Sequence, residues 1–137
     1  LVTKTYSLGN FSIGVICRKD STTTLSFYLF TTEEPATRWA LYRRVSGSYT
    51  LIGNNIQDPA VNDVMKLRAD GSTIKGFVNS IELISVTDTN ITGNLRCGIR
   101  GYSDATLNVG ELDDWSAADL AAPAATGVGW YGRAGWF

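Results

Sequence analysis

Short segments rich in β-branched and aromatic residues follow one another along the chain, and Gly, Asn, Asp and Pro separate them at short intervals. This pattern is typical of an antiparallel β-sandwich or barrel. One brief helix is expected in the segment WSAADLAA, which begins at Trp115 and has Ser116 as a cap. The pattern predicts strands at residues 3–7, 11–18, 24–31, 39–45, 49–53, 64–69, 73–78, 81–87, 95–100 and 105–114.

Several connections between these segments are short enough to be hairpin turns. Ser-Gly-Ser at 46–48 separates ALYRRV from YTLIG, and Asp70 with Gly71 separates MKLRA from TIKGFV. Asn79 and Ser80 then join TIKGFV to IELISV. Loops of this length connect antiparallel partners. The sequence therefore predicts an all-β fold built from antiparallel sheets.

Length and composition indicate one soluble, globular domain. The chain has 137 residues, of which 44% are hydrophobic and 18% charged, and this balance argues against disorder. No apolar run approaches the roughly 20 residues that span a bilayer, so no membrane contact is expected. The net charge of -1 lacks the broad positive field that attracts nucleic acid, so no nucleic-acid partner is expected either.

The chain contains no histidine, which removes the usual general base near neutral pH and the commonest transition-metal ligand. Serine-histidine and cysteine-histidine mechanisms are therefore excluded. Cys17 and Cys97 are too few for a structural zinc site. Each shares a period-2 position with apolar neighbours, so both sulfurs are expected to point into the core. They are either two buried thiols or a disulfide, and the sequence leaves both possibilities open.

The composition changes after Ala121, which divides the chain into a sandwich domain at 1–120 and an extended C-terminal arm at 121–137. The arm is rich in Ala and Gly and has no core of its own. Its aromatic residues would expose apolar area unless they dock on a surface. That surface is the sandwich itself or a neighbouring subunit or particle, and a disordered arm is the third possibility. The docking residues are Trp130, Tyr131, Trp136 and Phe137.

Three stretches carry a resemblance to a known family: ALYRRVSGSYTLIG, DVMKLRADGSTIKGFVNSIELISVTDTNITGNLRCGIRG and ATLNVGELDDWSAADL. They resemble the concanavalin A-like, laminin-G-like jelly-roll domains, in which a strand ending in a Gly turn precedes an "adGst…vNG" hairpin. The resemblance runs from Ile13 to Trp115 and implies a jelly roll of two antiparallel sheets. Such modules include carbohydrate-binding domains and sandwiches appended to phage tail and capsid proteins.

The sequence departs from the family pattern at two points. Ser80 replaces the Gly that follows the hairpin Asn, and the earliest family strands are short or absent before Thr3. One edge of the sandwich is therefore expected to be incomplete. Because an unpaired strand edge invites aggregation, we expect another part of a longer chain, the arm or a partner to cover it.

Carboxylates in this sequence do not form a recognisable catalytic or metal-binding set. Glycoside hydrolases on this sandwich place two catalytic carboxylates on one strand, and the nearest match here is Glu111, Asp113 and Asp114. No further acidic residue continues that alternation, so no catalytic residue is assigned. Two loop clusters, one of Asp58, Asn62 and Asp63 and the other of Asp88 and Asn90, lack the spacing of a calcium loop. No metal and no cofactor are expected.

Glycan binding needs an exposed aromatic face with polar groups around it. In ALYRRV, Leu41 and Arg43 alternate with Tyr42 and Arg44, so only one of these sets can face the core. Trp39 is the residue least expected to be buried. Polar neighbours are expected among Arg38, Asn54, Asn55, Arg100 and Asp104. The candidate glycan-binding residues are Trp39, Tyr42, Arg43, Tyr49 and Tyr102.

The predicted function is a non-enzymatic structural or decoration module of a virion, in the first place a bacteriophage capsid or tail. It would dock through its arm on other virion proteins or on copies of itself, so a homo-oligomer is expected, and it could display a face that binds a cell-surface glycan. The alternative is an extracellular carbohydrate-binding module of a secreted multidomain protein. Leu1 in place of Met leaves processing, excision or an unusual start codon open, and LVTKTYSLG is not an intact signal peptide.

Overall fold

The computed structural model describes residues 11–20, 25–33, 37–60, 62–93, 96–103, 115–118 and 120. Every strand in these ranges overlaps a predicted one, whereas the predicted strands at 3–7 and 105–114 and the arm at 121–137 lie outside them. The described ranges contain no helix that could span a membrane. The strands are β1 (Phe11–Lys19), β2 (Phe27–Glu33), β3 (Arg38–Val45), β4 (Ser48–Asn55), β5 (Met65–Asp70), β6 (Thr73–Val78), β7 (Ile81–Thr87) and β8 (Arg96–Ser103).

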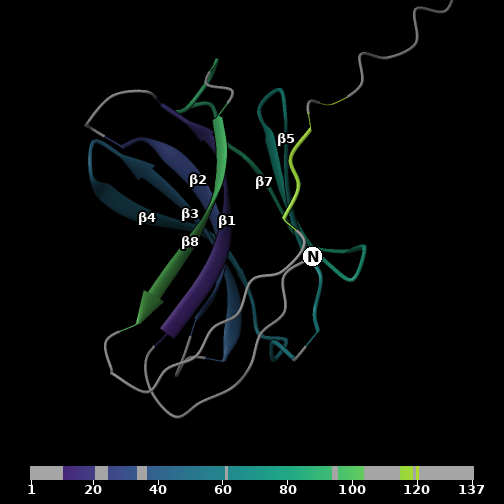
Figure 1. Ribbon diagram of the computed structural model, residues 1–137. Helices are drawn as coiled ribbons and strands as arrows, with labels where there is room; N and C mark the ends of the chain where they lie inside the picture. Colours follow the sequence, from purple (N-terminus) through teal and green to yellow (C-terminus); the bar gives the residue numbers. More distant parts are fainter. Residues whose placement is uncertain are drawn as a thin grey trace, which may run out of the picture.

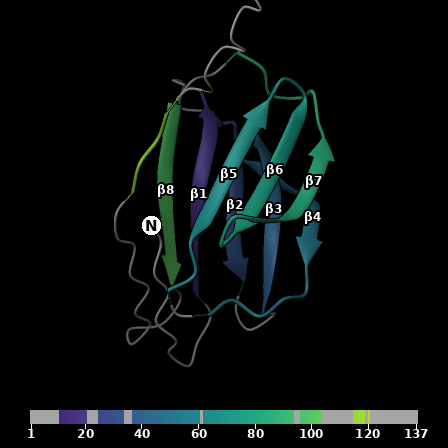
Figure 2. The same cartoon turned by 90° about the vertical axis from the view of Figure 1, so that its right-hand side faces the viewer.

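The strands form two sheets that pack face to face. The five-stranded sheet has the order β4-β3-β2-β1-β8 and the three-stranded sheet the order β5-β6-β7. All the pairs are antiparallel. Figure 1 shows the curvature of the larger sheet, and Figure 2 shows the smaller sheet lying across it. The predicted all-β antiparallel sandwich is confirmed.

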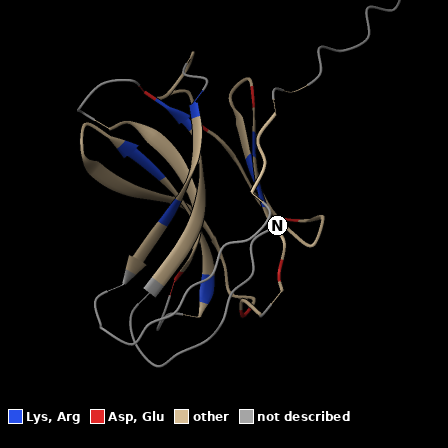
Figure 3. Ribbon diagram, in the orientation of Figure 1, with Lys and Arg blue, Asp and Glu red and all other residues tan. Residues whose placement is uncertain are grey.

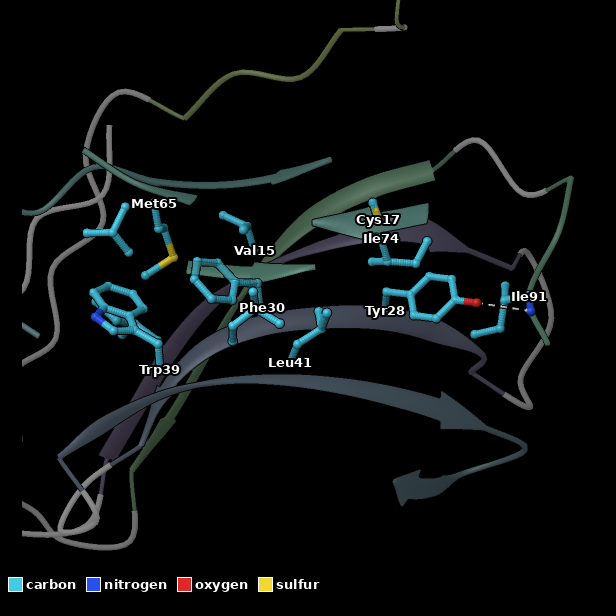
Figure 4. Packing of buried hydrophobic residues seen from close by; sticks show 12 residues of the cluster. Val15, Cys17, Tyr28, Phe30, Trp39, Leu41, Met65, Ile74 and Ile91 are labelled. Atoms are coloured by element: carbon cyan, nitrogen blue, oxygen red, sulfur yellow. Dashed lines mark hydrogen bonds between the residues drawn. The ribbon is translucent and has the colours of Figure 1, made fainter. Parts of the chain in front are cut away.

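The core lies between the two sheets. Side chains at every second position of β1, β2 and β3 point into it and meet Ile74, Val78 and Ile84 of the smaller sheet. Phe30 stacks on Trp39 with ring centres 5.3 Å apart, toward the left end of the cluster in Figure 4. Stacked aromatic pairs add to the free energy gained from burial. The core therefore depends on the strand alternation that the sequence displays.

Two glycines let the sheets approach closely. A Cβ at Gly76 would lie 2.6 Å from the Phe30 ring, and a Cβ at Gly53 would lie 2.6 Å from Cγ2 of Ile84. Both distances are shorter than a carbon-carbon contact allows. The positions thus exclude any larger side chain unless Phe30 or Ile84 moves.

The hairpin turns also agree with the sequence, including its unusual Ser80. Asn79 and Ser80 join β6 to β7 and have φ angles of 50° and 69°. Positive φ at both central positions is the geometry of a type I′ turn, whose twist matches that of the flanking strands. Ser80 therefore occupies a left-handed position that glycine adopts at lower cost.

The helix predicted from Trp115 is wrong for the residues that can be described. Residues 115–118 have no regular secondary structure and lie beside β5 in Figure 1. A single helical turn fixes several residues for very few hydrogen bonds, so it does not form without tertiary support. Local capping and Ala content were insufficient signals here.

The cysteines differ from each other, which corrects the expectation that both are buried. Both thiols are free; Cys17 is buried on β1, but Cys97 on β8 is exposed. β5 packs against β1 and β7 against β4, which leaves β8 beyond the cover of the smaller sheet. An inward-pointing position on β8 therefore meets solvent, as the 49% exposed Ile99 also shows.

Thiol labelling should distinguish the two cysteines. Burial, with a smaller effect from the neighbouring Cys97, raises the pKa of Cys17 to about 12, so its reactive thiolate is scarce at neutral pH. In the folded protein we expect a maleimide to modify Cys97 and to leave Cys17 unmodified until denaturant is added. Peptide mass spectrometry measures both sites. Modification of Cys17 at the rate of Cys97 in the folded protein would contradict the structure.

Candidate functional site

The five-stranded sheet has a second surface, turned away from the smaller sheet, which we call the outer face. Cross-strand partners share a face, so the register identifies its members. Tyr49 pairs with Arg44 and Arg44 with Phe27, while Arg100 pairs with Gly14 and Tyr102 with Ser12. The remaining members are Gly98, Ile16, Leu29, Thr31, Glu33, Arg38, Ala40, Tyr42, Leu51 and Asn54.

Aromatic rings from three neighbouring strands gather on the outer face. The Tyr49 ring packs edge-on against Tyr42 at 6.0 Å and against Phe27 at 6.1 Å between ring centres. Phe27 is buried beneath this group, whereas Tyr49 remains 43% exposed. On the other side of the face Tyr102 is 51% exposed. The outer face therefore presents aromatic surface to solvent at both sheet edges.

Two arginines lie close to the Tyr49 ring. The guanidinium carbon of Arg44 lies 4.9 Å from the ring centre, and that of Arg100 lies 5.9 Å from it. Arg100 also lies 5.4 Å from the ring centre of Tyr102 and donates from Nη1 to Oγ of Ser12 at 3.1 Å. Cation-π contacts at these distances are favourable by about 0.5–1 kcal/mol each at exposed sites. The rings and guanidinium groups form one continuous cluster.

The contact between Arg100 and Tyr49 shows that the sheet is curled. These residues belong to β8 and β4, the two edges of the sheet, which would be about 19 Å apart if it were flat. Curvature and twist bring their side chains together over the outer face, as the curved strands in Figure 1 show. Leu29 and Ala40 beneath them are consequently 1% and 0% exposed. The outer face is thus concave and has its own apolar floor.

A hydrogen-bonded group lies at one end of the outer face. Nε of Arg38 donates to Oε2 of Glu33 at 2.5 Å, and the hydroxyl of Tyr42 donates to Oε1 of the same carboxylate. Burial and then the Glu33 carboxylate raise the pKa of Tyr42 to about 12, so its hydroxyl remains protonated. Glu33 is therefore fully engaged by groups of its own sheet.

Two predicted glycan-binding residues do not belong to the outer face. Trp39 is fully buried and stacks on Phe30, and its Nε1 has no hydrogen-bond partner among the described residues. Arg43 also points inward, where Nη1 donates to Oδ2 of Asp88 at 2.6 Å. The reason is the phase of the alternation in β3, which puts Trp39, Leu41 and Arg43 on the core side. The structure brings the other three candidates, Tyr42, Tyr49 and Tyr102, to the outer face.

Arg44 and Phe27 also belong to the aromatic cluster, although neither was predicted as a site residue. Arg44 lies two residues after Tyr42, so both side chains lie on the same face of β3. This spacing could have placed Arg44 on the outer face once the core-facing side of β3 was known. Phe27 stands at the start of β2 and gives no signal, because most of β2 is buried on both faces. Arg100 was predicted as a polar neighbour of the aromatic residues, and the structure places it beside Tyr49 and Tyr102. At the end of β4, Asn54 pairs with Ala40 and shares the outer face, whereas Asn55 pairs with the inward-facing Trp39. Asp104 lies outside the described residues.

In the two loop clusters considered as calcium sites, Asp63 and Asp88 use their carboxylates for the fold. Oδ1 of Asp88 accepts from the Tyr28 hydroxyl at 2.7 Å and from the backbone of Asn90 at 2.8 Å. Oδ2 of Asp63 accepts from the backbone of Ala60 at 2.7 Å, and Oδ1 accepts from the amide of Asn79. In the described part of the chain, no three His, Cys, Asp or Glu side chains converge in a way that could hold a metal ion.

A separate cavity of about 790 Å³ lies at the edge of the core between β1, β5 and the segment that contains Trp115. Its lining is mostly apolar and includes Met65, Cys17 and Leu120. The cavity shares no residue with the aromatic cluster of the outer face. The carboxylates considered for catalysis, at positions 111, 113 and 114, lie outside the described residues, so the non-enzymatic prediction stays a prediction.

Comparison with known proteins identifies the fold. No protein-family model matches the chain, and no curated protein matches it in sequence. A solved structure described as the carbohydrate binding module CBM66 from Bacillus subtilis is similar, with a TM-score of 0.59 and 18% identity. The match covers 81% of this chain but 64% of the other. This similarity supports the predicted concanavalin A-like jelly roll.

Proposed function

We propose that this chain is a carbohydrate-binding module and that the outer face is its glycan site. The observation that carries the proposal is the pair of half-exposed tyrosines, Tyr49 and Tyr102, with Arg100 between them. A sugar ring offers apolar C-H faces that stack on aromatic rings, and its hydroxyls accept hydrogen bonds from guanidinium groups. The cluster contains both kinds of partner in one place.

The concave shape of the sheet supports this assignment. The floor residues Leu29 and Ala40 are buried, and the tyrosines and arginines stand on strands of the same hydrogen-bonded sheet, which is a rigid scaffold. A preorganised surface loses less conformational entropy when a ligand binds. The similar solved structure is itself described as a carbohydrate binding module, which favours the same class of ligand for this chain.

The proposal corresponds to the alternative function inferred from the sequence, an extracellular carbohydrate-binding module. The virion role, with docking through Trp130, Tyr131, Trp136 and Phe137, stays a prediction because those residues lie outside the described part of the chain. The fold similarity says nothing about a virion or about oligomers. A glycan-binding face is compatible with either setting.

Loss of a tyrosine ring should weaken glycan binding. For a saccharide found by array screening, we expect Tyr49→Ala and Tyr102→Ala each to raise the dissociation constant by about tenfold or more, because each removes a stacking surface. Isothermal titration calorimetry measures the constant. Trp115→Ala is the matched control, since Trp115 is a 45% exposed aromatic residue that lines the separate cavity.

The melting temperature of each variant verifies that it is folded. If Tyr49→Ala does not fold, Tyr102→Ala still tests the proposal, because the Tyr102 ring has no aromatic ring contact within the described residues. An array on which no saccharide binds, or folded tyrosine variants that bind as tightly as the Trp115→Ala control, would refute the proposal.

A further inference from the structure

The charge of the five-stranded sheet differs from that of the whole chain. The chain carries a net charge of -1, yet Glu33 is the sole acidic residue within the five strands. Figure 3 shows Lys and Arg on this sheet and most Asp and Glu elsewhere. The cationic residues of the five strands are Arg18, Lys19, Arg38, Arg43, Arg44, Arg96 and Arg100.

Three arginines of the described residues have a carboxylate partner. Arg38 pairs with Glu33, Arg43 pairs with Asp88, and Arg68 on the smaller sheet pairs with Asp70 at 2.8 Å. A carboxylate neutralises the guanidinium charge and accepts several of its N-H groups. Arg18 is instead held by two backbone carbonyls, those of Ile91 and Gly71.

Arg44 and Arg100 lie on the outer face, beside Tyr49. Among the described residues neither forms an ion pair with a carboxylate. Nε of Arg44 donates to the carbonyl of Gly47 at 3.2 Å, and Nη1 of Arg100 donates to Ser12. A guanidinium has five N-H donors, so most of them remain available on each residue. Both charges lie within 6 Å of the Tyr49 ring centre.

Two positive charges beside one ring, with no carboxylate partner among the described residues, repel each other, and a bound anion would relieve that repulsion. Attraction to the ring opposes the repulsion by about 0.5–1 kcal/mol for each exposed cation-π contact. The guanidinium fork matches the two oxygens of a carboxylate or sulfate group. Glu33, which could have supplied a carboxylate on this face, is already engaged by Arg38 and Tyr42.

We propose that the outer face is selective for acidic saccharides, those that carry a carboxylate or sulfate group. Arg44 and Arg100 bind the anionic group, and Tyr49 between them provides the stacking surface for the sugar ring. The inference rests on the proposed function and narrows its ligand class. Selectivity arises because a neutral sugar leaves both charges without a counter-ion, whereas an acidic sugar neutralises them.

Matched pairs of polysaccharides test this selectivity. Polygalacturonate and its fully methyl-esterified form share a backbone and differ in carboxylate charge, and dextran sulfate and dextran differ in sulfate charge. We expect affinity gel electrophoresis to show tighter binding, by about tenfold or more, to at least one acidic member than to its neutral counterpart. The preference should decrease as salt is added, because salt screens exposed charges. The two pairs distinguish a carboxylate from a sulfate ligand.

Arginine variants assign the effect to the outer face. Arg44→Gln and Arg100→Gln should each reduce the preference for the acidic polymer several-fold while retaining stacking on Tyr49. Arg68→Gln is the matched control: it removes the same charge from the smaller sheet, where Arg68 is exposed. We expect this control to bind as the wild type does.

The outcomes separate the two proposals. Equal binding of acidic and neutral polymers, lost in Tyr49→Ala, would refute acidic selectivity and leave the carbohydrate-binding function intact. A preference that Arg68→Gln reduces as much as Arg100→Gln would also refute it, because net charge would then be the cause. Failure of every saccharide to bind would refute the proposed function itself.

Discussion

Replacing Asp88 with Ala should lower the free energy of unfolding by about 3 kcal/mol or more, because it leaves buried groups without their partner. The carboxylate of Asp88 follows β7 and accepts hydrogen bonds from Tyr28 of β2, Arg43 of β3 and its own neighbour Asn90. It therefore ties the smaller sheet to the larger one. Without it, the Arg43 charge remains partly buried and unpaired.

Denaturant unfolding measures this loss, with Asp70→Ala as the control. Asp70 pairs with Arg68, but both side chains are exposed, and exposed pairs contribute about 0–1 kcal/mol. We expect the Asp88 variant to be destabilised at least about threefold more than the control. Equal losses in the two variants would show that the Asp88 network does not hold the sheets together.

The same network makes the free energy of unfolding depend on pH in the acid range. Burial opposes ionisation of Asp88, but hydrogen bonds from Tyr28, Asn90 and Arg43 outweigh it and hold the pKa below its usual value. A lowered carboxyl pKa contributes stability above the unfolded pKa of about 4, and this contribution is lost as the pH falls through the folded pKa. The stability difference between the wild type and Asp88→Asn should therefore shrink below about pH 4.

Replacing Trp39 with Ala should cost about 3–5 kcal/mol of folding stability, because it empties a large volume in the core. Trp39 is fully buried and stacks on Phe30. Trp39→Phe should cost much less, since it keeps an aromatic ring and removes an indole Nε1 that has no partner among the described residues. Thermal and denaturant unfolding of the two variants give the comparison.

The stability of these variants also tests whether Trp39 belongs to the core or to the glycan-binding face. A Trp39→Ala variant that unfolds readily cannot report on glycan contact, so Tyr49 and Tyr102 are the appropriate positions for binding tests. If Trp39→Ala were as stable as the wild type but lost glycan binding, Trp39 would have to lie on the binding face, against its full burial in the structure.

Most of the strands could be predicted because their signals are local. The β6–β7 hairpin is an example: alternation in TIKGFV and IELISV and the turn at Asn79 and Ser80 lie within a few residues of each other. The predicted ranges 73–78 and 81–87 coincide with β6 and β7. The strand predicted at 24–31 is shifted in the structure, where β2 begins at Phe27. Most of β2 is buried on both faces, so its sequence lacks the alternation of apolar and polar residues that would mark its bounds.

The candidate site was predicted in part, because its residue types are visible but their faces are not. Tyr42, Tyr49 and Tyr102 were expected as a group and share the outer face. Trp39 and Arg43 were assigned to the same group but occupy the opposite side of β3. When large residues occupy both alternating sets of positions in a strand, either set could face the core. Only packing against the neighbouring elements selects one of them.

The amino-acid sequence by itself determined the class of fold, the turn positions and the absence of histidine chemistry, because these follow from composition and from contacts between near neighbours. Only the tertiary structure decided that β8 lies beyond the smaller sheet, that Cys97 is exposed, and that Arg100 meets Tyr49. The last contact joins opposite edges of one curled sheet. Strand order and curvature result from packing between residues far apart in the chain, so no local pattern encodes them.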